Sequence, residues 1–449
     1  MIIDQLLCLE EGKTLEFKEN LESLNSIIKT IIAFANTSGG IIIIGIEDKT
    51  KKVVGVENPL LQEERLTGSI HNNIAPLLMP DIQIYTYQDK ELILINVPHA
   101  TGPYYLKSKG LENGTYIRLG STTRLADAET IQALKNFARN VFFDELPYVT
   151  GSKDDLNWEI INLLFRSVKK EINEENVQNL GILVNHNNKI VPSFGGIILF
   201  GKNRLKLFPE SIIRCVRFAG NTRDIIIDQF DAINYLPLAL DEVIKFIKRN
   251  TKLGSEIVGL RRKDIPEYPP QAVREAIINA IVHADYAISG VYISVAIFEN
   301  RIEITNPGSL PFGITIEKAL AGASRIRNRV IAKVFYNLKL IEQWGRGINI
   351  IMQECQDAGL EDPKFEELNN QFRVTLYSAK KAKKHLVKND KVLEFLEKEE
   401  KINTQKAAEL WNITPRAARL RLIKLVQNNS LKRVADSLYD PKSFYTLKN

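Results

Sequence analysis

Acidic residues near the start of the chain have a spacing that suits metal-dependent chemistry. Glu11 and Glu16 precede Lys18, and Asp48 follows the apolar run 41–46. Acidic side chains at a strand end can converge, and two or three carboxylates can hold a divalent cation that orients water against a phosphodiester. The alternative is a set of surface acids or ion-pair partners of Lys18. The pattern therefore indicates either phosphodiester hydrolysis or an ordinary charged surface.

A second set of chemically capable residues lies on a predicted helix at 270–284. Glu275, Asn279 and His283 recur every four positions, so they share one face of that helix. A carboxylate and an amide one turn apart can place a general base and a Mg²⁺ ligand beside a triphosphate. The rest of the helix is mostly apolar, so these polar side chains are expected to be partly buried and to need partners. The alternative is a polar stripe on a solvated face.

The motifs around the N-terminal acids resemble the Schlafen core, also called the AlbA_2 domain. They are EGKTLEFK at 11–18, AFANTSGG at 33–40, IGIED at 44–48 and YIRLGS at 116–121. The resemblance spans roughly residues 1–142 and implies an α/β domain. Some Schlafen proteins are metal-dependent endoribonucleases that cut tRNA or rRNA, which implies that Glu11, Glu16 and Asp48 are catalytic and bind Mg or Mn. Many prokaryotic members are described instead as transcriptional regulators, so nucleic-acid binding without cleavage is the alternative.

The motifs around the second set resemble the GHKL ATP-binding fold of gyrases, histidine kinases and MutL. They are REAIINAIVHADY at 274–286, ITNPGSLP at 304–311, SRIRNR at 324–329 and IEQWGRGI at 341–348. The resemblance implies an α/β sandwich that binds ATP, with Glu275 as catalytic base and Asn279 as metal ligand. The residues it implies for nucleotide contact are Asn279, His283, Asn306, Gly308, Gly345, Arg346 and Gly347.

One residue departs from the GHKL pattern. Asn306 stands where that family has the aspartate that reads adenine, and an amide can donate and accept hydrogen bonds but carries no charge. A degenerate domain used for dimerisation is the alternative to ATP binding.

The C-terminal segment is predicted to read nucleic acid. Helical patterns at 390–399, 404–411 and 415–427 precede a possible wing at 430–447, and the sequence looks like a winged helix-turn-helix. On the last helix, Arg416, Arg419 and Arg421 are placed to meet phosphate or bases. The last 70 residues hold 17 of the 60 Lys and Arg but 8 of the 54 Asp and Glu. Such domains also bind proteins, which is the alternative.

Periodicity predicts an α/β multidomain fold. A helix at 21–35 leads through a glycine turn to a strand at 41–46, and paired strands are expected within 291–304. The middle of the chain is predicted to hold a buried strand at 189–200 and a helix at 236–250. The predicted domains are 1–147 (Schlafen-like), 148–265 (connecting α/β region), 266–379 (GHKL-like) and 380–449 (winged helix).

The bulk composition narrows the class of protein. The chain has 449 residues, of which 44% are hydrophobic, and no apolar stretch approaches the roughly 18 residues of a membrane span. The first residues are acidic where a signal peptide would be basic, so a cytoplasmic protein without membrane contact is expected. Cys8, Cys215 and Cys355 are far apart, which predicts neither a disulfide framework nor a zinc site.

Two functions from different classes follow from these patterns. The first is a nucleotide-responsive endoribonuclease that uses Mg or Mn to cut tRNA or other RNA, in stress or phage defence. The second is a transcriptional regulator that binds ATP and DNA without cleavage. A scaffold with degenerate domains is a third. Because GHKL proteins often work as dimers, the resemblance also implies a homo-oligomer.

Overall fold

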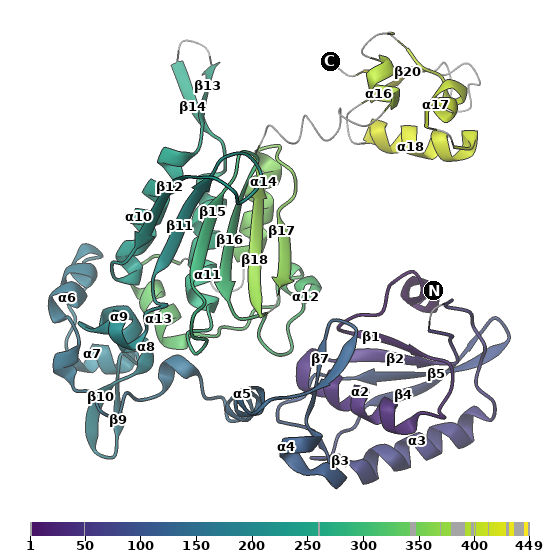
Figure 1. Ribbon diagram of the computed structural model, residues 1–449, viewed down its shortest axis with the longest axis horizontal. Helices are drawn as coiled ribbons and strands as arrows, with labels where there is room; N and C mark the ends of the chain where they lie inside the picture. Colours follow the sequence, from purple (N-terminus) through teal and green to yellow (C-terminus); the bar gives the residue numbers. More distant parts are fainter. Residues whose placement is uncertain are drawn as a thin grey trace.

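The protein is a mixed α/β chain with three regions of structure (Figure 1). Its N-terminal unit (residues 2–138) holds a four-stranded sheet, its central unit (139–378) holds a six-stranded sheet, and a small C-terminal unit spans 391–447. The predicted α/β multidomain class is confirmed. No helix in the described part of the chain has the length and apolarity to cross a membrane. The computed structural model describes residues 2–48, 50–258, 261–341, 347–368, 370–378, 391–396, 399, 401–411, 413–427, 431–434 and 444–447.

The N-terminal sheet is built around one buried helix. Its order is β1 (Leu15–Lys18), β2 (Gly40–Ile44), β5 (Lys90–Val97) and β4 (Asp81–Tyr87). β1 and β2 are parallel because α2 (Leu24–Thr37) crosses between them. In the buried last turn of α2, the Asn36 amide donates to the carbonyls of Tyr104 and Tyr116 and accepts from the Tyr104 N–H. Asn36 therefore holds the turn in place. The other elements are α1 (Ile2–Leu7), α3 (Pro59–Asn73), β3 (Ile74–Ala75), β6 (Tyr105–Leu106), η1 (Lys107–Lys109), α4 (Gly110–Gly114), β7 (Tyr116–Leu119), β8 (Thr122–Leu125) and α5 (Ala128–Ala138).

Residues 189–200 form a strand and a helix, so the prediction of one buried strand there is wrong. β10 (Lys189–Pro192) pairs with β9 (Leu183–His186), and α8 (Phe194–Phe200) follows. The Ser193 hydroxyl caps α8 by accepting a hydrogen bond from the Gly196 N–H at 2.9 Å. α8 is buried on nearly every side, so its apolar run lacks helical periodicity and looks like a buried strand. The neighbouring elements are η2 (Phe143–Glu145), η3 (Lys153–Asp155), α6 (Trp158–Ser167), α7 (Glu174–Asn179) and α9 (Arg204–Leu207).

The central sheet joins two stretches that the sequence assigned to separate regions. β11 pairs in parallel with β15, and one hydrophobic core runs from Leu156 to Leu376. The sheet therefore crosses the predicted boundary at 265/266. β15 and β16 form the predicted antiparallel pair. The strand order is β12 (Ile226–Ala232), β11 (Ile213–Phe218), β15 (Ile293–Ile297), β16 (Arg301–Pro307), β18 (Gln371–Tyr377) and β17 (Lys364–Leu368).

Helices cover one face of this sheet (Figure 1). α10 (Leu236–Asn250) packs on β11 and β12, while α11 (Pro270–His283) packs on β16 and against α14 (Gly347–Asp357). α10, α11 and α14 supply apolar side chains to the same core, so the polar residues of α11 must lie at the edge of that core. The remaining elements are the hairpin β13 (Leu253–Val258) and β14 (Arg261–Pro266), with α12 (Ile316–Leu320).

A side chain from the linker, the stretch 139–146 that joins α5 to the rest of the central unit, caps α13 (Arg329–Asn337). The fully buried Asp144 carboxylate accepts hydrogen bonds from the N–H groups of Arg329, Val330 and Ile331 at 3.1, 2.7 and 3.1 Å. Burial raises the pKa of Asp144 to about 7, although the three amide donors oppose the shift. The carboxyl group thereby ties the linker to the central unit.

The N-terminal and central units contact each other through residues 308–326. In this segment the Gly313 N–H donates to the Thr37 carbonyl at 2.7 Å, and Lys318 Nζ donates to the Ser38 carbonyl at 3.0 Å. The ring of His99 lies against Gly313, where an added Cβ would come within 2.4 Å of His99 Cδ2. Outside this segment, Lys13 of the N-terminal unit and Glu367 of the central unit form an ion pair at 2.7 Å. The two units are therefore joined by polar bonds as well as by packing.

In its described residues, the C-terminal unit has three helices and a hairpin around its own core. α16 (Lys391–Leu396), α17 (Thr404–Trp411) and α18 (Pro415–Gln427) follow the predicted helical patterns. β19 (Leu431–Val434) and β20 (Phe444–Leu447) are antiparallel. The Tyr445 N–H donates to the Ile402 carbonyl at 2.8 Å and so joins the hairpin to the segment before α17.

We expect acid to weaken the packing around His99. Burial, with the charges of Arg325 and Lys318, lowers the pKa of His99 from 6.5 to about 4 in the folded protein. In the unfolded chain, the His99 ring therefore binds a proton at a higher pH than in the folded protein. The contribution of the neutral ring to the free energy of unfolding is complete above pH 6.5 and is lost as the pH falls toward 4. Because the ring is only partly buried, the loss should be roughly 1–2 kcal/mol.

Thermal unfolding between about pH 7.5 and about pH 4.5 measures this effect. His99→Gln should reduce the pH dependence, whereas His71→Gln, at an exposed position on α3, should keep it. A His99→Gln profile identical to that of the wild type would exclude His99 as the titrating group.

Candidate functional site

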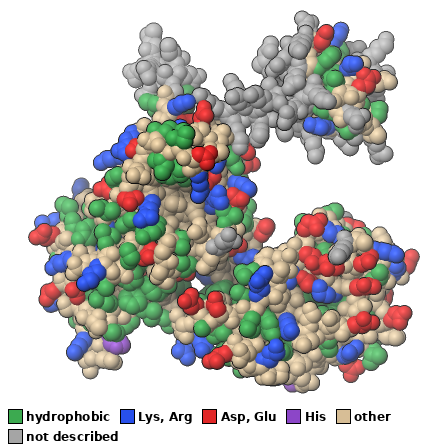
Figure 2. Space-filling view, viewed as in Figure 1, with side chains coloured by type: hydrophobic (Ala, Val, Ile, Leu, Met, Phe, Trp, Pro, Cys, Tyr) green, Lys and Arg blue, Asp and Glu red, His purple; other side chains and the backbone are tan. Residues whose placement is uncertain are grey.

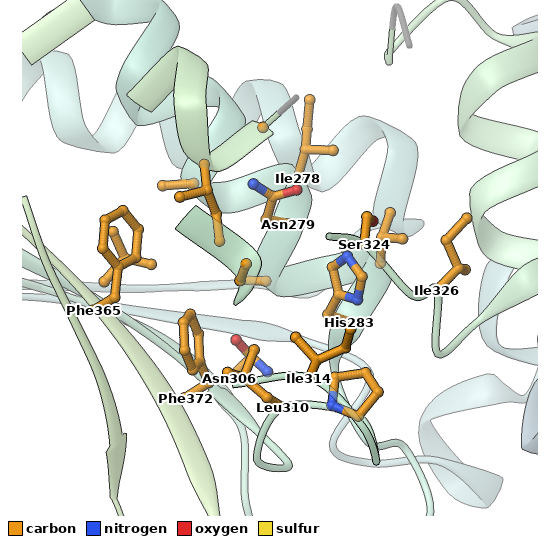
Figure 3. Close-up of a pocket in the computed structure, with 18 of the residues that line it drawn as sticks. Ile278, Asn279, His283, Asn306, Leu310, Ile314, Ser324, Ile326, Phe365 and Phe372 are labelled. Carbon is orange, nitrogen blue, oxygen red and sulfur yellow. The ribbon is translucent and has the colours of Figure 1, made fainter. Parts of the chain in front are cut away.

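One pocket collects most of the residues that the sequence assigned to nucleotide binding. Glu275, Asn279 and His283 from α11 line it, as do Asn306 and Gly308 from the end of β16 and Gly347 from the start of α14. Figure 3 shows Asn279 and His283 from α11 and Asn306 from β16 around the same cavity. Gly345 and Arg346, which were predicted with them, lie outside the described residues.

The walls of this pocket are mainly apolar. Ile304, Ile314, Ile326, Phe365 and Phe372 are among the side chains that line it, and Figure 3 shows several of them around the cavity. The cavity volume is about 120 Å³, far above the roughly 10–15 Å³ that a single water needs. An apolar cavity with a few polar groups at its edge is the usual form of a small-molecule site.

At one end of the pocket, the main chain approaches the predicted base and metal ligand very closely. A Cβ on Gly347 would lie 2.5 Å from both Glu275 Oε1 and Asn279 Nδ2. Gly347 is also the first residue of α14, and the first N–H groups of a helix have no partner within it. A side chain at position 347 would have to displace Glu275 and Asn279, so the glycine lets the backbone at the start of α14 lie next to both residues.

At the other end, a partly buried arginine fixes the turn after β16. Arg327 donates to the Ser309 carbonyl at 2.6 Å and to the His283 carbonyl at 3.3 Å. Gly308 has φ +89°, and an added Cβ would overlap the Arg327 guanidinium. Arg327 lies in the motif at 324–329, but the sequence indicates no role for it, because its partners are distant in the chain: two carbonyl groups and the Asp285 carboxylate at 3.8 Å.

The electrostatic state of the pocket follows from burial. Burial, with the positive charge of Arg327, lowers the pKa of His283 to about 4, so this ring is neutral near pH 7. The side chain of Asn306 is buried, and its Nδ2 donates to the Pro307 carbonyl at 3.0 Å. His283 and Asn306 can therefore take part in hydrogen bonds to a ligand without adding charge.

The N-terminal acids also come together. Burial raises the pKa of Glu11, and its neighbours Glu16 and Asp48 raise it further, the latter through a hydrogen bond between the two carboxyl groups. Glu11 Oε1 accepts from the Phe17 N–H at 2.7 Å. Glu16 is buried on β1, while Asp48 is exposed after the strand. Glu11 therefore lies close enough to Glu16 and Asp48 to feel the charge of both.

Both oxygens of the Glu16 carboxylate are paired with cationic side chains. One oxygen pairs with the Arg118 guanidinium and the other with Lys18 Nζ at 2.5 Å. Arg118 is buried, donates also to the carbonyl of Gly12 and to the hydroxyl of Thr123, and lies over the Phe34 ring. Sequence analysis missed this pair because its members are 102 positions apart.

The arrangement does not fit a divalent metal as it stands. Both Glu16 oxygens and one Glu11 oxygen are engaged, and no group of three or more His, Cys, Asp or Glu side chains within the described ranges has the geometry of a metal site. The sequence left open whether these acids bind a metal or form ion pairs with Lys18. The contacts of Glu16 fit the ion pair better than the metal site.

The predicted nucleic-acid contacts lie on α18. The side chains of Arg419 and Arg421 are exposed, and the Arg421 guanidinium lies 4.5 Å from the centre of the Trp411 ring. Arg416 is in the first turn of the same helix, but its side chain lies outside the described set. α18 therefore presents at least Arg419 and Arg421 to solvent.

Two segments of the chain match known protein families. Residues 11–127 match the Schlafen, AlbA_2 family. Residues 290–376 match the HATPase_c_4 family, described as "Putative ATP-dependent DNA helicase recG C-terminal". The first segment contains Glu11, Glu16 and Asp48. The second begins after α11, so Glu275 and Asn279 lie outside it.

Individual proteins resemble the chain more distantly. An uncharacterized ATP-binding protein of Ureaplasma parvum serovar 3 is 23% identical over 202 residues, which cover 43% of this chain and 56% of that protein. The chain thus matches little more than half of this curated relative. The crystal structure of the DIP2311 protein from Corynebacterium diphtheriae has 21% identity and a TM-score of 0.46, covering 99% of this chain and 96% of that chain. The N-terminal domain of a RecG-related protein from Nitrosomonas europaea has 30% identity and a TM-score of 0.23, covering 28% and 90%.

We expect Glu16→Gln to destabilise the N-terminal unit. The change leaves the buried Arg118 guanidinium without its carboxylate partner, and removing one member of a buried ion pair costs roughly 3–5 kcal/mol. Glu11→Gln is the matched control, because the Glu11 carboxylate bonds a backbone N–H and should lose much less stability. Thermal unfolding compares the two variants. An unchanged unfolding temperature for Glu16→Gln would show that the Arg118 pair is not structural.

Proposed function

We propose that this protein is a nucleotide-responsive regulator that binds nucleic acid, with ATP in the pocket between α11, β16 and α14. The observation that carries this proposal is that residues 308–326 form part of the pocket wall and also contact the N-terminal unit. Gly308, Leu310 and Ile314 line the pocket, while Gly313 and Lys318 bond the N-terminal unit. A ligand that moves this wall must also act on that contact.

The residues of the pocket fit ATP in their chemistry. Its apolar walls suit a planar base, and Asn306 can both donate and accept at the edge of that base. The Gly347 backbone lies against Glu275 and Asn279, and N–H groups at the start of a helix such as α14 favour anions. Asn279 would hold the Mg²⁺ that accompanies the triphosphate, and Glu275 is placed to orient a water.

Glu367 connects the pocket to the N-terminal acids. Its Oε1 accepts from the Leu310 N–H at 2.9 Å, and its carboxylate pairs with Lys13 at 2.7 Å. Lys13 lies between Glu11 and Glu16 in the AlbA_2 segment. Movement of Leu310 would therefore displace the loop that carries these acids. We propose that the effect of ATP binding reaches the N-terminal unit by this route.

Nucleic-acid binding is assigned to the AlbA_2 segment together with the C-terminal unit. The two helices α17 and α18 followed by the β19–β20 hairpin have the element order of a winged helix, with Arg416, Arg419 and Arg421 on the recognition helix. On the face seen in Figure 2, acidic and basic side chains are mixed over the N-terminal unit. This mixture favours the C-terminal arginines as the main phosphate contacts.

Endoribonuclease activity is the second candidate function. The approach of Glu11, Glu16 and Asp48 favours it. Because Glu16 is already paired with Arg118 and Lys18, we rank endoribonuclease activity below nucleic-acid binding without cleavage.

We expect Asn279→Ala to reduce ATP affinity by about tenfold or more, because the variant removes a polar ligand at the phosphate end of the pocket. Isothermal titration calorimetry with Mg-ATP measures the change. Gln353→Ala, which removes an exposed amide from α14, should bind ATP like the wild type. A wild-type protein that binds no ATP at millimolar concentration would end the nucleotide half of the proposal.

We expect Gly313→Ala to uncouple the two units while leaving ATP binding within about twofold. Its φ of +85° is strained for alanine, and the new Cβ would collide with the His99 ring. The readout is the ratio of affinities for a single-stranded RNA oligonucleotide with and without ATP, measured by fluorescence anisotropy.

Gly359→Ala is the matched control for this variant. Gly359 has φ +65°, but a Cβ there would meet nothing within 4 Å. This control should keep the wild-type ratio. If Gly313→Ala kept it too, the signal would not pass through this contact.

A further inference from the structure

A second cavity lies where the N-terminal unit and its linker meet the central unit. Its volume is about 760 Å³, and its walls include Phe137, Asn140 and Phe142 on one side and Arg325 and Arg329 on the other. It shares residues 324–326 with the pocket assigned to ATP but contains none of the polar α11 residues. The two cavities thus lie on either side of one stretch of chain.

The side chains that line this cavity are strongly biased toward positive charge. Arg325, Arg329 and Lys333 face one carboxylate, Glu145. None of the three cations forms an ion pair in the described part of the chain, although other arginines of the central unit do. Arg329 and Lys333 are one turn apart on α13, so their charges lie on the same face of the helix.

The two guanidinium groups are held in place before any ligand arrives. Arg325 lies 4.5 Å from the centre of the Phe137 ring and donates to the Phe312 carbonyl at 2.9 Å. Arg329 lies 3.9 Å from the centre of the Phe142 ring and donates to Asn140 Oδ1 at 2.8 Å. Each guanidinium has five N–H donors, so both keep donors for a further partner. Fixed groups of this kind lose little entropy on binding.

We propose that this junction cavity binds a phosphate-bearing anion through Arg325, Arg329 and Lys333. Planar guanidinium groups match phosphate oxygens in geometry, and a partly enclosed site strengthens their attraction. The phosphates come either from a free polyphosphate or from the backbone of a single-stranded nucleic acid, and both present the same oxygens. The bound anion contacts both units at once, so it also holds them together. This site does not depend on the function proposed above.

Calorimetry on the full chain tests the site with two probes, inorganic pyrophosphate and a short single-stranded RNA. The double variant Arg329→Gln/Lys333→Gln should weaken binding of at least one probe by about tenfold or more, because two charge-assisted contacts are lost. The matched control is Lys245→Gln/Lys248→Gln, which removes two exposed cations from α10 and should bind like the wild type. Lys333→Gln alone removes an exposed side chain, so it keeps the test valid if the double variant does not fold.

The Asn279→Ala variant separates this site from the ATP pocket. It should bind the probes like the wild type, whatever its affinity for ATP. Loss of pyrophosphate binding alone in the cation variants would identify a free polyphosphate as the ligand, and a loss of RNA affinity in them would identify the nucleic-acid backbone. The proposal is overturned if the wild type binds neither probe, or if the cation variants bind both probes like the wild type.

Discussion

The buried carboxyl group of Asp144 determines how several parts of the molecule meet. It satisfies three N–H groups at the start of α13, which have no partner inside the helix. Just before that helix, Asn328 donates to the carbonyls of Val282 and Ala284 at the end of α11. One linker carboxylate therefore orients α13, the end of α11 and the stretch 322–328 between the two cavities. Loss of that carboxylate would leave buried amides unsatisfied in a place that no water reaches easily.

The two sets of polar residues illustrate opposite uses of burial. In the pocket of the central unit, burial makes His283 neutral, and the Gly347 backbone lies against Glu275 and Asn279. In the N-terminal unit, Glu16 and Arg118 are buried as an ion pair, which satisfies both partners internally. Polar side chains thus line a cavity in one unit and form a buried ion pair in the other.

The sequence predicts local structure well where periodicity and end signals agree. The helices at 236–250, 404–411 and 415–427 begin and end as expected, because their apolar spacing is clear and two of them begin at a proline or one residue before it. The α11 residues Glu275, Asn279 and His283 were found for the same reason. Residues 189–200 were misread because a helix that is buried on nearly every side has no periodic signal.

Long-range relations were beyond the reach of the sequence. The parallel pairing of β11 with β15 merges two predicted regions, and no local pattern announces it. The Arg118–Glu16 and Lys13–Glu367 pairs likewise depend on how distant strands and loops meet. The family motifs indicate where the predicted site residues lie in the sequence, and the fold shows which of them already have partners.

The contact of Gly313 with Thr37 and His99 has an evolutionary consequence. Residues 308–326 must preserve a cavity wall on one side and a docking surface on the other. A larger residue at position 313 would strain a backbone whose φ is +85° and would also meet the ring at position 99, so glycine should be kept at 313 during divergence. The segment as a whole should diverge in sequence more slowly than surface loops that contact a single neighbour.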